Sequence, residues 1–115
     1  MVDDQDAAAV SVKRDGGVAT IAGSGSLDFM NSQEFRDQLM RASDEMDGVS
    51  ADLRGAFFID TAILAYLAQS AKTLRLRGKQ LRVVVREGSH PERVLRLSCF
   101  GQLMEIESEP AETGG

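Results

Sequence analysis

An acid and a hydroxyl stand next to each other where an apolar run changes into an amphipathic one. In the stretch FFIDTAIL, Asp60 and Thr61 follow the apolar residues 57–59 and precede a pattern typical of a helix. A helix start leaves backbone N–H groups unpaired and carries partial positive charge, so an acid or a threonine there is an ordinary N-cap. A hydroxyl exposed at the same place can accept a phosphate, which adds a charge of about −2 and changes the surface that a partner meets. The residue types leave both roles open.

Other groups that could do chemistry are few and scattered. His90 is the one histidine of the chain, and beside Pro91 it is expected to be a solvated loop residue rather than a catalytic one. Cys99, the one cysteine, follows a predicted helix at its C-terminal end, the wrong end for activating a thiol, and is expected to be a small buried hydrophobic residue. One histidine and one cysteine do not make a closed zinc site, and no glycine-rich phosphate-binding motif with its lysine occurs. The sequence therefore predicts no enzyme, no cofactor and no metal.

The composition is that of one globular domain. The chain has 115 residues, of which 43% are hydrophobic, and this suits a single core. Its net charge of −5 argues against nucleic acid as a partner, because binding phosphates needs a basic surface. No apolar run reaches the roughly 20 residues that cross a bilayer, and the acidic start MVDDQDAAA has no secretory-signal pattern. We therefore expect a cytoplasmic protein that does not insert into a membrane.

The hydrophobic patterns predict elements in the order β-β-α-β-α-β-α-β. They comprise a hairpin over 9–23, helices over 31–46, 61–77 and 91–98, and strands over 49–53, 80–85 and 103–108. Each strand–helix–strand passage favours parallel pairing with a right-handed crossover. The expected fold is therefore α/β, with a mixed, mostly parallel sheet of about five strands and about three helices packed against it.

Three local features of the sequence lead to further expectations. The segment GSGS at 23–26 is interpreted as flexible punctuation between the hairpin and the first helix. Asn31 is expected to cap that helix, with Glu34 completing a capping box. Leu67 recurs at helical spacing with other apolar residues of 61–77, which predicts that it lies in the core.

Three segments together resemble the STAS family, the anti-sigma factor antagonists of bacteria. GSLDFMNSQEFRDQL is similar to the family's G-E-[LI]-D segment and first helix, and ADLRGAFFIDTAILAYLAQSAKTLRLRGKQLRVV to its D-L-S-x-x-x-[FY]-[IM]-D-[ST]-[ST]-G-L block. PERVLRLSCFGQLMEIE is similar to the family's later pattern x-x-[VL]-x-x-[IL]-x-x-x-G-[LF]-x-x-x-[FI]. The expected domain covers 9–107, between a flexible lead-in at 1–8 and a flexible tail at 108–115.

The resemblance implies a binding module rather than an enzyme. Family members dock on a partner serine/threonine kinase, often an anti-sigma factor with a GHKL-type ATPase domain. That kinase phosphorylates the residue directly after the motif acid and so releases the antagonist. By resemblance Thr61 is the phospho-acceptor and Asp60 the motif acid. Asp28 and Ala62 are expected to join them in the partner-binding surface.

The chain departs from the family pattern at its motif. The common form reads D-S-S-G or D-S-T-G, whereas residues 60–63 read D-T-A-I and lack the glycine. D-T-A also occurs in the STAS subunit of lipid-transport ABC systems, and a threonine before bulky residues is similar to stressosome-type STAS domains. The alternative function is therefore a structural STAS subunit that is not switched by phosphorylation. The family's last helix is short or absent here, which favours a homodimer.

Overall fold

Five strands and three helices alternate in the predicted order in the part of the chain that the structure, a computed structural model, describes: residues 9–30, 32–98 and 100–111. The elements are β1 (Ala9–Asp15), β2 (Val18–Leu27), α1 (Gln33–Glu45), β3 (Gly48–Ile59), α2 (Thr61–Leu76), β4 (Leu81–Arg86), α3 (His90–Leu97) and β5 (Glu105–Glu109). A short 3₁₀ helix at Phe100–Gln102 precedes β5. The α/β architecture expected from the sequence is confirmed.

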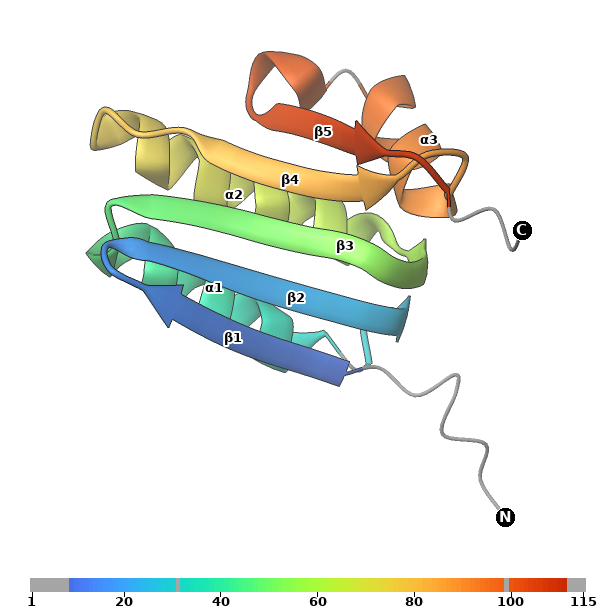
Figure 1. Cartoon of the computed structure of the whole chain (residues 1–115), viewed down its shortest axis with the longest axis horizontal. Helices are drawn as coiled ribbons and strands as arrows, with labels where there is room; N and C mark the ends of the chain where they lie inside the picture. Colours follow the sequence, from blue (N-terminus) through green and yellow to red (C-terminus); the bar gives the residue numbers. More distant parts are fainter. Residues whose placement is uncertain (1–8, 31, 99, 112–115) are drawn as a thin grey trace.

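The strands form one sheet in the order β1-β2-β3-β4-β5, in which only the first pair among the described strands is antiparallel (Figure 1). β1 and β2 are joined by a tight turn in which Gly16 has φ of 62°, a conformation that glycine adopts without steric cost. The other three connections each contain a helix. All three helices lie behind the sheet in Figure 1, so the sheet has one covered face and one bare face.

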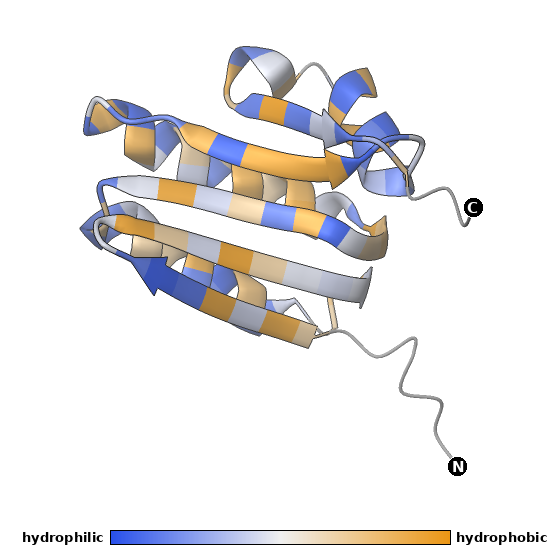
Figure 2. Ribbon diagram, in the orientation of Figure 1, coloured by the Kyte–Doolittle hydropathy of each residue, from blue (hydrophilic) through white to orange (hydrophobic). Residues whose placement is uncertain are grey.

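The core fills the space between the sheet and the helices. Along β2, buried residues alternate with half-exposed ones, as expected for a strand with one covered face. The largest fully buried side chains are aliphatic apart from one aromatic: Phe35, Ile21, Leu27, Leu39, Leu53, Ile59, Ile63, Leu67, Leu74, Leu81, Leu95 and Met104. Figure 2 shows β4 as a nearly continuous apolar strand, in agreement with the sequence. Leu67 lies in the core as predicted.

The strand predicted at 49–53 is much longer, because β3 continues to Ile59. Its pairing with β4 reaches Asp52, and beyond that point the described register continues with β2 as far as Ile59. The exposed side chains of Phe57 and Phe58 break the alternation of apolar and polar residues that identifies a strand in a sequence. The sequence therefore indicated a short strand followed by a link.

The segment 23–26 is also strand, not flexible punctuation. It forms the end of β2 and pairs with β3, with irregular register between Ala22 and Ser24 and between Gly25 and Ser26. Gly25 has φ of 79°, which a residue with a side chain rarely adopts. A Cβ at position 23 would lie 2.7 Å from Leu27 Cδ1. The absence of a side chain at Gly23 therefore allows Leu27 to pack closely against the strand. These glycines shape a bulged strand rather than a loop.

The start of α1 differs by one residue from the prediction. Ser32 is the N-cap, its buried side chain makes no capping hydrogen bond, and Gln33 is the first helical residue. The predicted capping box rests on Asn31, which lies outside the described residues, as does Cys99. The last strand runs to Glu109, one residue beyond the predicted 108.

Polar contacts join α1 and α2 in the part of α2 that lies away from its start. The hydroxyls of Ser43 in α1 and Ser70 in α2 share a buried hydrogen bond. Arg77, the C-cap of α2, donates from Nη1 to the carbonyl oxygens of Ser43 at 2.7 Å and Met46 at 2.8 Å. The guanidinium thus satisfies carbonyl groups at the end of α1 that have no partner within that helix.

Candidate functional site

The predicted site residues lie at one end of the sheet, beyond the C-terminal ends of β2 and β3. Asp28 follows the last residue of β2, and Asp60 follows the last residue of β3. Thr61 and Ala62 are the first two residues of α2. Because β2 and β3 are parallel neighbours, their ends deliver both acids to the same edge. The start of α3, at His90, lies on the β4 side of this edge.

Asp60 is the N-cap of α2, so this interpretation of the motif acid holds in the structure. Its Oδ1 accepts from the backbone N–H of Ala62 at 2.9 Å and of Ile63 at 3.4 Å. The carboxylate thus satisfies the Ala62 N–H, one of the groups that a helix start leaves unpaired, and shares the Ile63 N–H with the Asp60 carbonyl oxygen, which accepts it at 3.1 Å. The negative carboxylate also complements the partial positive charge of the helix start.

The same carboxylate holds the neighbouring loop in place. Asp60 Oδ2 accepts from the backbone N–H of Phe29 at 2.6 Å, and Asp28 Oδ1 accepts from that of Met30 at 2.9 Å. Asp60 N–H in turn donates to the carbonyl oxygen of Leu27 at 3.1 Å. The acids therefore join the β2–α1 loop to the start of α2, and a change at Asp60 is transmitted to Phe29.

Thr61 is exposed at the first position of α2. The N–H groups of Ala62 and Ile63 already bond to Asp60, so a phosphate on Thr61 would meet a carboxylate before it met those donors. Two negative groups this close repel each other. A charge added at Thr61 would therefore act first on Asp60 and on the surface around it.

Four exposed apolar side chains lie in the two segments that adjoin this pair, and they were not predicted as site residues from the sequence. Phe29 and Met30 in the β2–α1 loop are 68% and 86% exposed, and Phe57 and Phe58 at the end of β3 are 56% and 41% exposed. We call these four residues the apolar rim. Large exposed apolar side chains next to a candidate site are typical of a protein-binding surface. Their signal in the sequence was the pair FM directly after Asp28 and the pair FF, which Ile59 alone separates from Asp60.

His90 is not the solvated loop residue expected from the sequence. It is half-buried and begins α3. Its Nδ1 accepts from the backbone N–H of Ile59 at 3.2 Å, and its ring stacks on Phe58 with centroids 4.7 Å apart and planes at 20°. No local pattern could reveal this, because the partners are about 31 residues apart in the chain.

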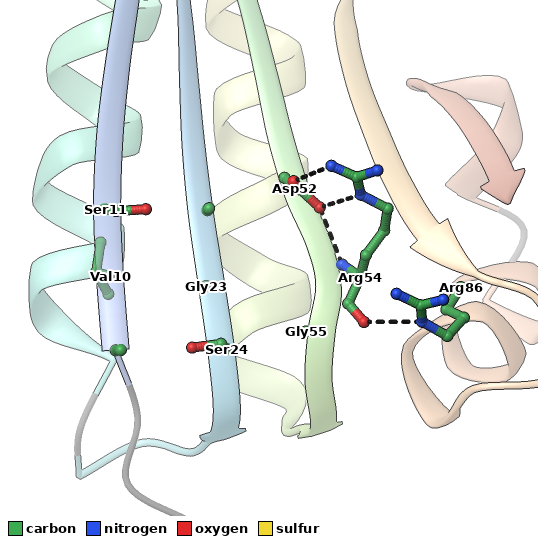
Figure 3. A pocket seen from close by; sticks show the side chains of 10 residues that line it. Val10, Ser11, Gly23, Ser24, Asp52, Arg54, Gly55 and Arg86 are labelled. Atoms are coloured by element: carbon green, nitrogen blue, oxygen red, sulfur yellow. Dashed lines mark hydrogen bonds and ion pairs between the residues drawn. The ribbon is translucent and has the colours of Figure 1, made fainter. Parts of the chain in front are cut away.

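A separate hollow of about 350 Å³ lies on the bare face of the sheet, lined by residues of β1 to β4 (Figure 3). Arg54 dominates it, pairing with Asp52 at 2.8 Å and with Glu109 at 2.9 Å, while Arg86 Nε donates to the Arg54 carbonyl oxygen at 3.4 Å. The hydrogen bond from the Arg54 side chain lowers the pKa of Asp52 from its ordinary value of 3.8. The predicted site residues do not line this hollow.

Unfolding of the wild-type chain is expected to become easier as the pH falls from about 4 to 2, in part through Asp52. Its pKa is lower in the folded state than in the unfolded state, so its contribution is complete above the ordinary value of 3.8 and is lost as the pH falls through the folded-state pKa. Because the Arg54 side chain is 42% exposed, that contribution is at most about 1 kcal/mol. Asp52→Asn should flatten the pH dependence in urea titrations, and Arg54→Gln should flatten it likewise. An unchanged slope in both variants would contradict the role of this pair.

Two structural features expected of other protein classes are not found among the described residues. No group of three histidine, cysteine, aspartate or glutamate side chains is arranged to hold a metal ion within 9–30, 32–98 and 100–111. Across the same residues, no helix has the length and apolar character needed to cross a membrane.

Known proteins share both the sequence pattern and the fold. The family model for the STAS domain matches residues 9–112. An anti-sigma factor antagonist from Mycobacterium paratuberculosis has a similar structure, with a TM-score of 0.78 and 19% identity over 89% of this chain and 86% of that one. The unphosphorylated anti-sigma factor antagonist SpoIIAA gives a TM-score of 0.73 and 14% identity over 88% of this chain and 90% of its own. Its phosphorylated form, described as a Bacillus cell fate determinant, gives 0.65 and 16% over 88% and 93%. No curated protein sequence matches significantly.

Proposed function

Since this chain belongs to the STAS domain family, we propose that it is a bacterial, cytoplasmic anti-sigma factor antagonist: a non-enzymatic module that docks on an anti-sigma factor and is released by phosphorylation at Thr61. One observation carries the proposal. Thr61 is exposed at the start of α2, next to the capping carboxylate of Asp60 and beside the apolar rim. The hydroxyl to be modified thus lies within the surface to be recognised.

The apolar rim and the two acids contribute differently to docking: the first to affinity, the second to the choice of partner. Burying Phe29, Met30 and Phe57 against a partner removes apolar surface from water and supplies the main attraction. The carboxylates of Asp28 and Asp60 favour a partner whose facing surface is basic. An anti-sigma factor with a GHKL-type kinase domain fits this description when the basic groups that bind its ATP phosphates also lie on the surface that faces this chain.

Phosphorylation changes the docking surface without unfolding the domain. The phosphate adds a charge of about −2 next to Asp60 and adds strongly hydrated oxygens to an interface that excludes water. It also repels the carboxylate that holds the Phe29 amide. We expect the affinity for the partner to fall, while the core behind Ile63, which is fully buried, keeps its packing. Release then follows from local charge on a rigid module.

Incubation with Mg-ATP and the anti-sigma kinases of GHKL type encoded in the source genome is expected to add one phosphate to the wild-type chain. Thr61→Ala should gain none in intact-mass measurement and should remain bound to the kinase in the presence of ATP. Thr73→Ala is the matched control, because Thr73 lies on the same helix away from the site, and it should be modified like the wild type.

The outcomes separate the two functions that the sequence left open. One phosphate mapped to Thr61, with release of the partner, supports the antagonist. A chain that binds a partner but is never modified contradicts the switch and favours a structural STAS subunit, such as a stressosome scaffold or an ABC-transporter partner. Modification of Thr61→Ala to the same extent as wild type would show that another residue is the acceptor.

A further inference from the structure

The end of β3 extends beyond the strand that should pair with it. The described pairing of β3 with β4 ends at Asp52 and Val84, whereas β3 continues to Ile59. Successive backbone amides of a strand point to opposite neighbours. Since the Asp60 N–H donates to Leu27 of β2, the Ile59 N–H points to the side where β4 would lie. A backbone amide needs an acceptor there, and the sheet supplies none.

His90 supplies that acceptor from the start of α3. Its Nδ1 receives the Ile59 N–H at 3.2 Å. Its ring also stacks on Phe58, with centroids 4.7 Å apart. One side chain therefore contacts the two residues that directly precede Asp60 and Thr61. The imidazole thus replaces the acceptor that a neighbouring strand would provide, at the end of β3 that leads into Asp60 and Thr61.

We propose that His90 is a positioning residue for the Thr61 site, an inference that rests on the proposed function. The Ile59 contact sets the direction in which the chain leaves the sheet, and Asp60 must leave it correctly to reach both α2 and Phe29. The His90 ring also packs on Phe58 of the apolar rim, and this contact is expected to matter less for the rate than the Ile59 hydrogen bond. A kinase that must align the Thr61 hydroxyl with ATP gains from this order, because small misplacements of reacting groups cost rate.

Two substitutions at His90 separate its two contacts. His90→Phe keeps a ring to stack on Phe58 and removes the acceptor, so the Ile59 amide should exchange with solvent about fivefold faster, the factor expected for one lost hydrogen bond. The rate of Thr61 phosphorylation should fall by about three- to tenfold. His90→Asn keeps an acceptor, since Oδ1 of asparagine can take the place of Nδ1, and loses the ring. It should retain the Ile59 protection, and its phosphorylation rate should stay within about twofold of wild type.

A variant that only lowers stability provides the control. Arg77→Ala removes two hydrogen bonds at the far end of α2 and does not touch β3. It should lower the thermal midpoint and leave both the Ile59 exchange rate, measured relative to neighbouring amides, and the phosphorylation rate unchanged. Equal loss of rate in Arg77→Ala and His90→Phe would mean that His90 acts only through stability.

The measurements distinguish this inference from the proposed function. Unchanged Ile59 exchange in His90→Phe, or faster exchange with a wild-type rate of phosphorylation, overturns the positioning role while the antagonist function stands. If no kinase modifies the wild-type chain, the proposed function is overturned. The exchange rates of the two His90 variants then still decide whether this side chain fixes the segment before Thr61.

Discussion

Leu67→Ala is expected to lower the free energy of unfolding by about 2–5 kcal/mol. The side chain is fully buried near the middle of α2, where this helix covers the sheet. Its truncation removes apolar contacts and leaves a cavity that the surrounding side chains fill only in part. A loss of this size is a large share of the stability of a domain of this length.

Leu76→Ala is the matched control for this prediction. It makes the same chemical change on the same helix, but Leu76 is 90% exposed, so the stability should stay within about 0.5 kcal/mol of wild type. Urea unfolding followed by circular dichroism measures the stability of both variants. The dependence of the unfolding free energy on urea concentration should be the same as in the wild type. Comparable losses in the two variants would show that the facing of α2 is wrong.

Asp60→Ala is expected to lower the free energy of unfolding by about 1–3 kcal/mol. Loss of an N-cap costs about 0.5–2 kcal/mol, and the Phe29 amide also loses a charged acceptor. Because the Phe29 amide lies in an exposed loop, water replaces part of the second contribution. The β2–α1 loop should become more mobile. Because Phe29 in this loop belongs to the apolar rim, the affinity of the variant for a partner should fall.

Asp60→Asn separates the cap from the charge. Asparagine caps helices as well as aspartate does, so this variant should keep most of the stability that alanine loses. Thermal unfolding and amide exchange at Ala62 and Phe29 measure the two effects. If asparagine destabilised as much as alanine, the carboxylate charge rather than the capping geometry would be the main contribution of Asp60.

The sequence predicted most of the fold because most elements carry local signals. The hairpin has its glycine turn, and α2 has an apolar stripe that includes Leu67. The length of β3 was not predictable, because its last residues are stabilised by β2 on one side and by a histidine of α3 on the other. Exposed phenylalanines in a strand also contradict the pattern on which a strand is recognised.

The candidate site was predictable where it depends on residue type and not where it depends on contacts. Asp60 at a helix start announces its capping role, and the structure confirms that geometry. The hydrogen bond from Phe29 to Asp60 joins residues about 31 positions apart, and so does the contact of His90 with Ile59. Contacts at such separations are determined by the topology of the sheet, which no local pattern contains.

Because helices cover only one face of the sheet, the other face can carry a fluorescent label with which binding is followed. Because all three helices lie behind the strands, a fluorophore attached to the opposite surface near the start of β2 would disturb neither the hydrophobic interior nor the end of the sheet that carries Asp60 and Thr61 (Figure 1). Thr20, half-exposed near the beginning of β2, faces that way and is far along the strand from Asp28. A label there would report binding of a partner through the slower tumbling of the whole particle.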